Sequence, residues 1–151
     1  MPEFRFFHPI EVRYGDLDPQ GHLNNAKYLT YFEQARIHYL GNLGLFSPGQ
    51  SFMSIGIILA KVEVTFLAPV EYGMDCRVGM RITQLGNKSM ITEYTLIDAA
   101  TKQELATGSA VLVGYDYRIK ETIPIPQEWR EKIVQFERIE HPSEIKYRNN
   151  N

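Results

Sequence analysis

Several residues that can take part in catalysis lie close together in the stretch GDLDPQGHLNN, from Gly15 to Asn25. Asp18 supplies a carboxylate, which can attack a carbonyl carbon or take a proton from water. A helical pattern begins at Asn25, and the first turn of a helix presents unpaired backbone N–H groups that stabilise a developing oxyanion. A carboxylate shortly before such a helix start indicates acyl-transfer chemistry.

The same stretch also has a structural interpretation, because Asp residues in turns commonly accept hydrogen bonds from backbone N–H groups. Asp16 favours this interpretation, since its side chain can brace the turn. Histidine is a residue type suited to proton transfer, but a single histidine such as His22 can equally anchor a loop. Asn24 or Asn25 can cap the helix. From the residues alone, catalytic and structural roles both remain open for Asp18 and His22.

The segments around this stretch have the periodicities of a strand and a helix. Residues 4–14 alternate in the manner of a strand, and residues 25–40 carry an apolar stripe at helical spacing. The stripe consists of Tyr28, Leu29, Phe32, Ala35, Tyr39 and Leu40. Gly41 is placed to end this helix. The loop that follows, residues 42–56, is long enough to border a binding site.

Four further strands are expected from alternating apolar residues, and turn sequences separate them. They lie within residues 57–70, 75–86, 88–99 and 103–118. Short connections of this kind join antiparallel neighbours. The last strand carries the small residues Ala106, Gly108 and Ala110, which leave room for close packing on the sheet.

A shorter amphipathic helix is expected within residues 123–140, with Trp129, Ile133 and Phe136 on one face. The predicted order is therefore one strand, a long helix, four antiparallel strands and a short helix. A long helix packed across an antiparallel sheet is an α+β arrangement.

The composition argues against several classes of protein. The 151 residues are 44% hydrophobic and 23% charged, with a net charge of -2, which is ordinary for one globular domain. We expect a single domain at 1–140 and a polar, flexible tail at 141–151. No dense basic run is present for nucleic acid, and no apolar run reaches the roughly 20 residues of a membrane span. The first residues do not have the pattern of a signal peptide, so we expect a cytoplasmic protein.

Several parts of the sequence together resemble a known family. The stretch RYGDLDPQGHLNNAKYLTYFEQAR resembles the signature of hotdog-fold acyl-CoA thioesterases of the 4-hydroxybenzoyl-CoA thioesterase class. VEVTFLAPVEYGMDCRV, GNKSMITEYTLID and GSAVLVGYDYRIKETIPIP resemble the successive strands of that family, so the resemblance covers roughly residues 8–130. It implies a hotdog fold, in which a curved antiparallel sheet wraps a long central helix. It also implies homodimers, often paired into homotetramers, with sites at the protomer interface.

The resemblance assigns roles within the opening stretch. It implies that Asp18 is the nucleophile or general base, that the backbone N–H of Asn25 is the oxyanion donor, and that Asp16 supports the turn. The GHLNN segment is also similar to plant acyl-carrier-protein thioesterases, which use His and Asn around this helix. His22 is therefore a possible catalytic participant, and Asn24 a substrate contact.

Other candidates lie outside this stretch. Glu33 is a second carboxylate, but it lies roughly 12 Å along the helix from Asn25, and Arg36 is placed at i+3 to form an ion pair with it. We therefore expect structural roles for both. Tyr28, on the same helix, either shapes the pocket for the acyl group or belongs to the core.

Coenzyme A carries phosphates, and the turn GNKS places Lys88 and Ser89 where a cation and a hydroxyl could bind one. Arg81 is a weaker candidate for the same contact. Coenzyme A would enter as part of the substrate. The expected reaction needs no metal and no other cofactor. Cys76, the single cysteine, is expected to be a buried, unreactive thiol.

The predicted function is hydrolysis of an acyl-CoA to a carboxylic acid and free coenzyme A. Three alternatives remain open: a thioesterase acting on acyl carrier protein, a hotdog hydratase or dehydratase acting on enoyl thioesters, and a hotdog protein that binds acyl-CoA without catalysis. The sequence does not distinguish attack by Asp18 itself from attack by water.

Overall fold

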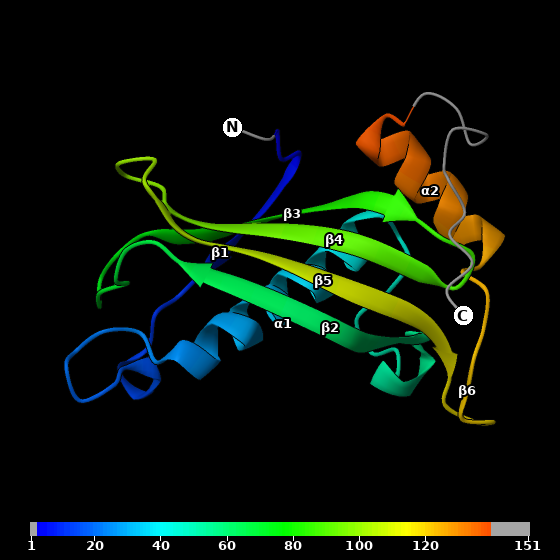
Figure 1. Ribbon diagram of the computed structural model, residues 1–151, viewed down its shortest axis with the longest axis horizontal. Coiled ribbons are helices and arrows are strands. Elements are labelled where there is room, and N and C mark those ends of the chain that lie inside the picture. The colour runs from blue at the N-terminus through cyan, green and yellow to red at the C-terminus, as the bar shows by residue number, and fades with distance from the viewer. Residues whose placement is uncertain (1–2, 140–151) are drawn as a thin grey trace. The chain divides into compact units, whose positions relative to one another are not determined.

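The computed structural model describes residues 3–139, so the predicted tail at 141–151 lies outside the described residues. Its elements follow one another as shown in Figure 1. The strands are β1 (Phe6–Ile10), β2 (Ile57–Phe66), β3 (Cys76–Leu85), β4 (Ser89–Asp98), β5 (Glu104–Asp116) and β6 (Glu121–Thr122). The α-helices are α1 (Asn25–Asn42) and α2 (Gln127–Glu137), and two short 3-10 helices are η1 (Tyr14–Asp16) and η2 (Phe52–Ser54).

The strands form one sheet in the order β1-β3-β4-β5-β2, and the short strand β6 pairs with β5. β1 runs antiparallel to β3, with His8 opposite Val78. The four strands expected after the long helix are confirmed, each within a few residues of its predicted ends. The first strand is shorter than the predicted 4–14, because only Phe6–Ile10 pairs with β3. Neither β6 nor η2 was predicted.

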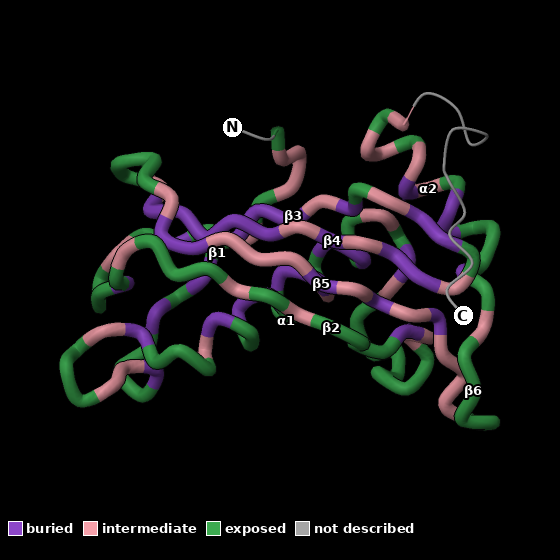
Figure 2. The backbone as a smooth tube through the Cα atoms, viewed as in Figure 1, coloured by how far each residue is buried: buried purple, intermediate pink, exposed green. Residues whose placement is uncertain are grey.

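The strands differ in how far they are buried (Figure 2). Val78, Met80 and Ile82 of β3 are almost completely buried, as the alternating pattern predicts. β2 is mostly exposed along its length, and the large apolar side chains of Ile58 and Phe66 on it are exposed. β2 is also an edge strand of the sheet, so one of its two sides has no neighbouring strand.

Helix α1 begins as predicted but ends later. The side-chain oxygen of Asn24 accepts the N–H of Ala26 at 3.0 Å, which confirms the predicted N-terminal cap. The prediction that Gly41 ends the helix is wrong, because α1 continues to Asn42. The chain reverses at Gly44, where φ is +72°, and the N–H of Leu45 bonds the carbonyl of Leu40 at 2.8 Å. Such a C-terminal motif needs the left-handed residue that glycine supplies at least cost.

The buried side of α1 packs tightly on the sheet. The ring of Phe32 stacks on Tyr94 of β4, with centroids 4.8 Å apart. A Cβ atom on Gly108 of β5 would lie 2.6 Å from the Phe32 ring, so the small residues of β5 do admit a close neighbour. Leu29, which was expected in the apolar stripe, is 37% exposed instead.

The chain divides into two compact units, and the division cuts through α1 and the strands β2 to β5. Among the described residues, the first unit comprises residues 3–39, 63–81 and 94–108. The second comprises residues 40–62, 82–93 and 109–139. The first unit contains the polar stretch around Asp18, and the second contains η2, β6 and α2.

Candidate active site

The stretch that precedes α1 folds into a small hairpin. The N–H of Asn24 donates to the carbonyl of Asp16 at 2.9 Å, Leu17 and Leu23 form a bridge, and the N–H of Asp18 donates to the carbonyl of His22 at 2.7 Å. Gly21 closes the turn with a φ of +79°. The hairpin therefore doubles the chain back, so that Asp18 and the start of α1 belong to one locally hydrogen-bonded structure.

Asp16 is buried, at 3% exposure, and its carboxylate has several hydrogen-bond and charged partners. It accepts hydrogen bonds from the Arg13 N–H at 3.1 Å and from the Tyr31 hydroxyl at 2.8 Å, and Lys27 lies 3.8 Å away. Burial alone would raise the pKa of Asp16, but these hydrogen bonds and the charges of Arg13 and Lys27 lower it overall. The contacts tie η1 to α1 and leave this carboxylate little capacity for a substrate.

Asp18 has different surroundings. It is half-buried, and its Oδ1 atom accepts the backbone N–H groups of Gln20 at 2.9 Å and His22 at 3.1 Å. Within residues 3–139, Oδ2 has no hydrogen-bond partner. The first oxygen therefore fixes the carboxylate on the turn, while the second remains available to a ligand or a water molecule.

Within residues 3–139, not all backbone N–H groups at the start of α1 have a hydrogen-bond acceptor. Those of Ala26 and Lys27 donate to the side chain and the carbonyl of Asn24. The N–H of Asn25 has no acceptor in the described part of the chain, and Asn25 is exposed. This N–H also lies at the positive end of the α1 dipole. It can donate to an oxygen that carries developing negative charge.

The remaining polar side chains of the hairpin region differ in their surroundings. His22 is half-buried and makes hydrogen bonds through its backbone, while its bridge partner is Glu71. Tyr28 is 3% exposed, and its ring meets Phe66 edge to face at 4.8 Å. Burial raises the pKa of the Tyr28 phenol, and Cys76 and Asp18 add to this rise. Tyr28 is thus a core residue whose phenol lies within electrostatic range of Asp18.

The predicted ion pair between Glu33 and Arg36 is not formed. Arg36 is buried and donates from Nε to the Tyr94 hydroxyl at 3.1 Å, with its guanidinium 5.7 Å from the centre of that ring. Glu33 is exposed and has no partner among residues 3–139. The prediction was wrong because the i+3 rule considers only the helix, whereas β4 offers Arg36 a buried acceptor and an aromatic face.

The cationic candidates are distributed over both units. In the first unit, Arg81 lies 5.1 Å from the centre of the Phe4 ring. In the second unit, Lys88 donates to the Thr122 hydroxyl at 3.3 Å, while Ser89 is only 6% exposed. Lys88 can reach a phosphate in solvent, but burial makes the Ser89 hydroxyl a poor partner for one.

Cys76 is completely buried in β3, and burial raises the pKa of its thiol to about 11. Such a thiol is protonated and unreactive at neutral pH, as expected. Across residues 3–139, no group of three or more His, Cys, Asp and Glu side chains is arranged to hold a metal ion. No helix within the same residues has the length and apolar character needed to cross a membrane.

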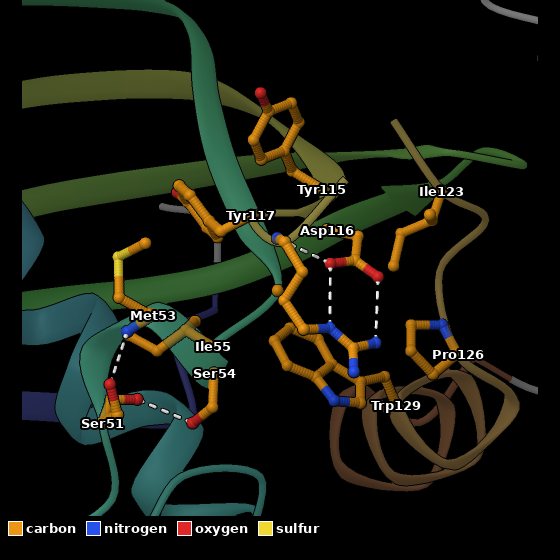
Figure 3. A pocket seen from close by; sticks show the side chains of 12 residues that line it. Ser51, Met53, Ser54, Ile55, Tyr115, Asp116, Tyr117, Ile123, Pro126 and Trp129 are labelled. Carbon is orange, nitrogen blue, oxygen red and sulfur yellow. Dashed lines mark hydrogen bonds and ion pairs between the residues drawn. The ribbon is translucent and has the colours of Figure 1, made fainter. Parts of the chain in front are cut away.

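The second unit contains a cavity of about 520 Å³ that the sequence did not reveal (Figure 3). Parts of segments 51–56, 115–118 and 123–129 line it. In the view of Figure 3, Met53 and Ile55 lie on the left, and Ile123, Pro126 and Trp129 on the right. The cluster YDYR and the single tryptophan were visible signals, but nothing in their spacing indicates that they enclose space together.

Comparison with known proteins agrees with this fold. A family model described as a thioesterase-like superfamily matches residues 12–133. The chain is similar to the long-chain acyl-CoA thioesterase FadM of Escherichia coli, with 26% identity over 84% of this chain and 96% of that protein. It is also similar to the plant acyl-acyl carrier protein thioesterase ATL3 of Arabidopsis thaliana, with 23% identity over 86% of this chain and 69% of that protein.

Among solved structures, a thioesterase from Thermus thermophilus complexed with coenzyme A and Zn superposes with a TM-score of 0.78. It is 34% identical to this chain, and the match covers 91% of this chain and 97% of that one. The family match spans most of the described residues and includes the hairpin, α1 and the strands β2 to β6, while β1 lies before it. The chain therefore belongs to the thioesterase-like superfamily and has its hotdog fold, an antiparallel sheet with two helices.

Proposed function

We propose that this protein hydrolyses acyl-CoA thioesters to a carboxylic acid and free coenzyme A. One observation carries the proposal: the hairpin that holds the Asp18 carboxylate leads directly into helix α1, and within residues 3–139 neither Oδ2 of Asp18 nor the N–H of Asn25 has a hydrogen-bond partner. Thioester hydrolysis needs both, a nucleophile or base and a donor for the oxyanion. The similarity to a long-chain acyl-CoA thioesterase and to a thioesterase complexed with coenzyme A supports the proposal.

The proposed reaction begins with the thioester oxygen at the N–H of Asn25. As a new bond forms at the acyl carbon, the electron pair of the C=O bond moves to this oxygen, and the N–H and the helix dipole stabilise the negative charge. The C–S bond then breaks, and the coenzyme A thiolate leaves and takes up a proton.

Asp18 can act in two ways. As a general base, its free oxygen takes a proton from the water that attacks the acyl carbon. As a nucleophile, it forms an anhydride with the acyl group, which water then hydrolyses to release the acid and restore the carboxylate. The hydrogen bonds from Gln20 and His22 hold the carboxylate for either route. Both routes use only this chain, water and the substrate, so the proposal includes no metal or other cofactor.

Supporting roles follow from the surroundings of the remaining residues. Asp16 positions the hairpin through Arg13 and Tyr31. His22 and Asn24 lie at the hairpin and can contact the substrate, and Tyr28 lies within electrostatic range of Asp18. Lys88 and Arg81 are proposed contacts for the phosphates of coenzyme A.

We propose in addition that the protein is a homodimer. β2 is an edge strand, and Ile58, Leu59, Phe66 and Leu67 on and beside it are 39% to 53% exposed. An edge strand with exposed apolar side chains pairs readily with a second copy of itself, and the two-fold symmetry of a dimer makes that pairing antiparallel. The catalytic site would lie at this interface, and two such dimers could form a tetramer. Light scattering should give a dimer or larger for the native chain and a smaller mass for Leu59→Lys.

A second candidate is hydrolysis of acyl groups on an acyl carrier protein. The similarity to the plant enzyme ATL3 favours it, and the polar GHLNN segment of the hairpin is compatible with both candidates. The chemistry at Asp18 and Asn25 would be the same, and only the carrier of the thioester would differ.

The decisive assay follows thiol release from matched acyl groups on coenzyme A and on acyl carrier protein. We expect rapid release from coenzyme A, over a panel of short, long, branched and aromatic acyl groups. Preferential release from the carrier protein would favour the second candidate. Hydration of an enoyl thioester without thiol release, or tight binding without any reaction, would contradict both. A cytoplasmic location remains an expectation that fractionation of cells would check.

A further inference from the structure

We propose that the cavity of the second unit is a binding site in its own right, and that it takes an uncharged aromatic molecule with one hydrogen-bond acceptor. All 12 residues that line the cavity belong to the second unit, so such a site needs no contact with the first. None of the residues proposed for catalysis lines it. The site goes beyond the proposed function, because its ligand is a free molecule and its occupancy can be measured without turnover.

Backbone hydrogen bonds hold the walls of the cavity together. The N–H of Tyr115 donates to the carbonyl of Gly56 at 2.8 Å, which joins the end of β5 to the segment before β2. The N–H of Ile123 donates to the carbonyl of Gly114 at 2.9 Å, which joins the segment before α2 to β5. The cavity is therefore part of the folded framework of the unit, as small-molecule sites usually are.

The size of the cavity sets the size of the ligand. A volume of about 520 Å³ lies within the range of small-molecule sites. It is more than three times the roughly 150 Å³ of an apolar protein cavity that binds benzene. A single ring would therefore leave most of the space empty, whereas two fused rings with a short substituent would fill much more of it.

The walls favour an aromatic ligand over a saturated one. Tyr115 and Tyr117 supply two rings that meet edge to face, with centroids 4.9 Å apart. Trp129 supplies a third ring, and Met53 and Ile55 lie on the other side of the cavity in Figure 3. Apolar walls favour any apolar ligand in proportion to the area removed from water. Aromatic rings add edge-to-face and offset-stacked contacts that only another ring can make.

Most polar side chains at the cavity already have partners within the protein. The Tyr117 hydroxyl donates to the carbonyl of Ile57 at 2.6 Å. The Ser51 hydroxyl accepts the Met53 N–H, and the Ser54 hydroxyl donates to the carbonyl of Ser51 at 2.6 Å. A sugar or a nucleotide needs many hydrogen bonds on entering a site, and these groups have little capacity left for them. An aromatic ring system needs few or none.

The charged side chains of the cavity neutralise each other. Both carboxylate oxygens of Asp116 accept hydrogen bonds from Arg118, at 3.4 Å from Nε and 3.2 Å from Nη2. An anionic ligand near Arg118 would therefore also meet the negative charge of Asp116, and a cationic ligand near Asp116 would meet Arg118. A charge that enters an apolar site without its own counter-charge is costly, so the pair favours an uncharged ligand.

The wall also carries a hydrogen-bond donor. The ring of Trp129 is only 8% exposed, and its indole N–H has no acceptor among residues 3–139. An indole N–H can only donate, and a buried donor without an acceptor costs free energy. A carbonyl oxygen on the ligand can accept this hydrogen bond. Trp129 is the only tryptophan of the protein, so a signal from tryptophan comes from the cavity wall.

The first test uses prodan, an uncharged naphthalene ketone that fluoresces at shorter wavelength in apolar surroundings and is excited where tryptophan does not absorb. We expect the native protein to shift its emission with a saturable dependence on concentration. Ile55→Trp narrows the cavity and should weaken this binding about tenfold or more. Ile119→Trp, the matched control, makes the same change at an exposed residue that does not line the cavity and should change the affinity less than about twofold. No saturable shift, or equal effects of the two variants, would overturn the inference.

The second test compares ligands that displace prodan from the native protein. Acetylnaphthalene has two aromatic rings and one carbonyl acceptor and should displace it. Naphthoate, which replaces the ketone by a carboxylate, should bind about tenfold more weakly or worse. Acetyldecalin, the saturated analogue, should bind about threefold more weakly or worse. Equal affinity for the anion would refute an uncharged ligand, and equal affinity for the saturated analogue would refute an aromatic one.

The third test locates the bound molecule and does not depend on the folding of a variant. Fluorotryptophan incorporated into the native sequence gives one fluorine resonance, from Trp129. We expect saturating acetylnaphthalene to shift this resonance, because the ligand would lie against the indole. If prodan binds but acetylnaphthalene leaves the resonance unchanged, the ligand binds elsewhere on the protein and the inference fails.

Discussion

The hairpin before α1 and the cavity beside α2 use their polar groups in opposite ways. In the hairpin, Oδ2 of Asp18 and the N–H of Asn25 have no hydrogen-bond partner among residues 3–139. The backbone around them is nevertheless held by the hydrogen bonds of the hairpin. In the cavity, the hydroxyls of Ser51, Ser54 and Tyr117 already form hydrogen bonds within the protein. The cavity has a volume of about 520 Å³.

A reaction needs polar groups that are fixed but unused, because they must meet charge that develops during the reaction. The cavity of the second unit is instead a largely apolar volume, and the hydroxyls of Ser51, Ser54 and Tyr117 that line it are hydrogen-bonded within the protein. Substitutions can measure what holds each region in place, beginning with the largest expected effect on stability.

Trp129→Ala should have the largest effect on stability, because it removes a ring that is only 8% exposed from the wall of the cavity. Truncation of a buried tryptophan costs about 3 kcal/mol or more, measured as the loss in free energy of unfolding in urea. Trp129→Phe, the matched control, keeps an aromatic ring and should lose about half as much or less. Equal losses for both variants would contradict the packing argument.

Asp16→Ala should cost about 2 kcal/mol, because it leaves the Arg13 N–H and the Tyr31 hydroxyl without their buried acceptor. Urea unfolding again gives the value. Asp75→Ala is the matched control, since Asp75 is exposed and, within residues 3–139, its side chain pairs only with Arg77, at 3.6 Å. It should change stability by no more than about 0.5 kcal/mol. A loss for Asp16→Ala as small as that of the control would mean that this carboxylate does not hold the hairpin.

Tyr31→Phe should cost about 1 kcal/mol, since it removes one hydrogen bond to Asp16 and leaves the other contacts of the carboxylate. Tyr72→Phe provides the control, because Tyr72 is 66% exposed. The comparison is sharpest if both variants are unfolded under the same conditions. No difference between the two would contradict a stabilising bond between Tyr31 and Asp16.

Acid should weaken the hairpin by a smaller amount. The pKa of Asp16 is lower in the folded protein than its usual value, because hydrogen bonds and nearby cations outweigh the effect of burial. The folded state therefore gains stability from this group above the unfolded pKa of about 4. That stability is lost as the pH falls through the lower, folded value. Unfolding of the native protein and of Asp16→Asn should differ less at pH about 3 than at pH about 6. A difference that grows in acid would reverse the sign of this argument.

Part of the fold could be predicted from the sequence, because apolar residues that alternate along a strand can share one buried face. Val78, Met80 and Ile82 repeat every second residue and are buried together in β3. The start of α1 was also predictable, since Asn24 is a strong capping residue and its side chain does accept the Ala26 N–H. In both cases neighbours along the chain determine the outcome.

The failures arose where distant residues compete with neighbours. Arg36 pairs with Tyr94, fifty-eight positions away, and not with Glu33. The helix passes Gly41 because Gly44 offers a left-handed position and its own N–H bonds the Gly41 carbonyl. The cavity could not be predicted either, since segments 51–56 and 115–118 lie far apart in the sequence and neither has a pattern typical of a binding site.

Within the candidate site, the sequence identified the region but not the state of each group. It could not show that both carboxylate oxygens of Asp16 have partners, or that one oxygen of Asp18 has none among the residues that the structure describes. It also could not show that Ser89 is buried. These distinctions depend on which donors the fold brings to each atom.

The central claim is that hydrolysis depends on the charge of Asp18, and the most direct test is the rate of thiol release by the native protein and by Asp18→Asn. The asparagine keeps an oxygen for the N–H groups of Gln20 and His22, so the hairpin should remain folded and the free energy of unfolding should change by less than about 1 kcal/mol. We expect kcat on the best acyl-CoA to fall at least about a hundredfold. A folded Asp18→Asn variant that retains the native kcat would contradict the account.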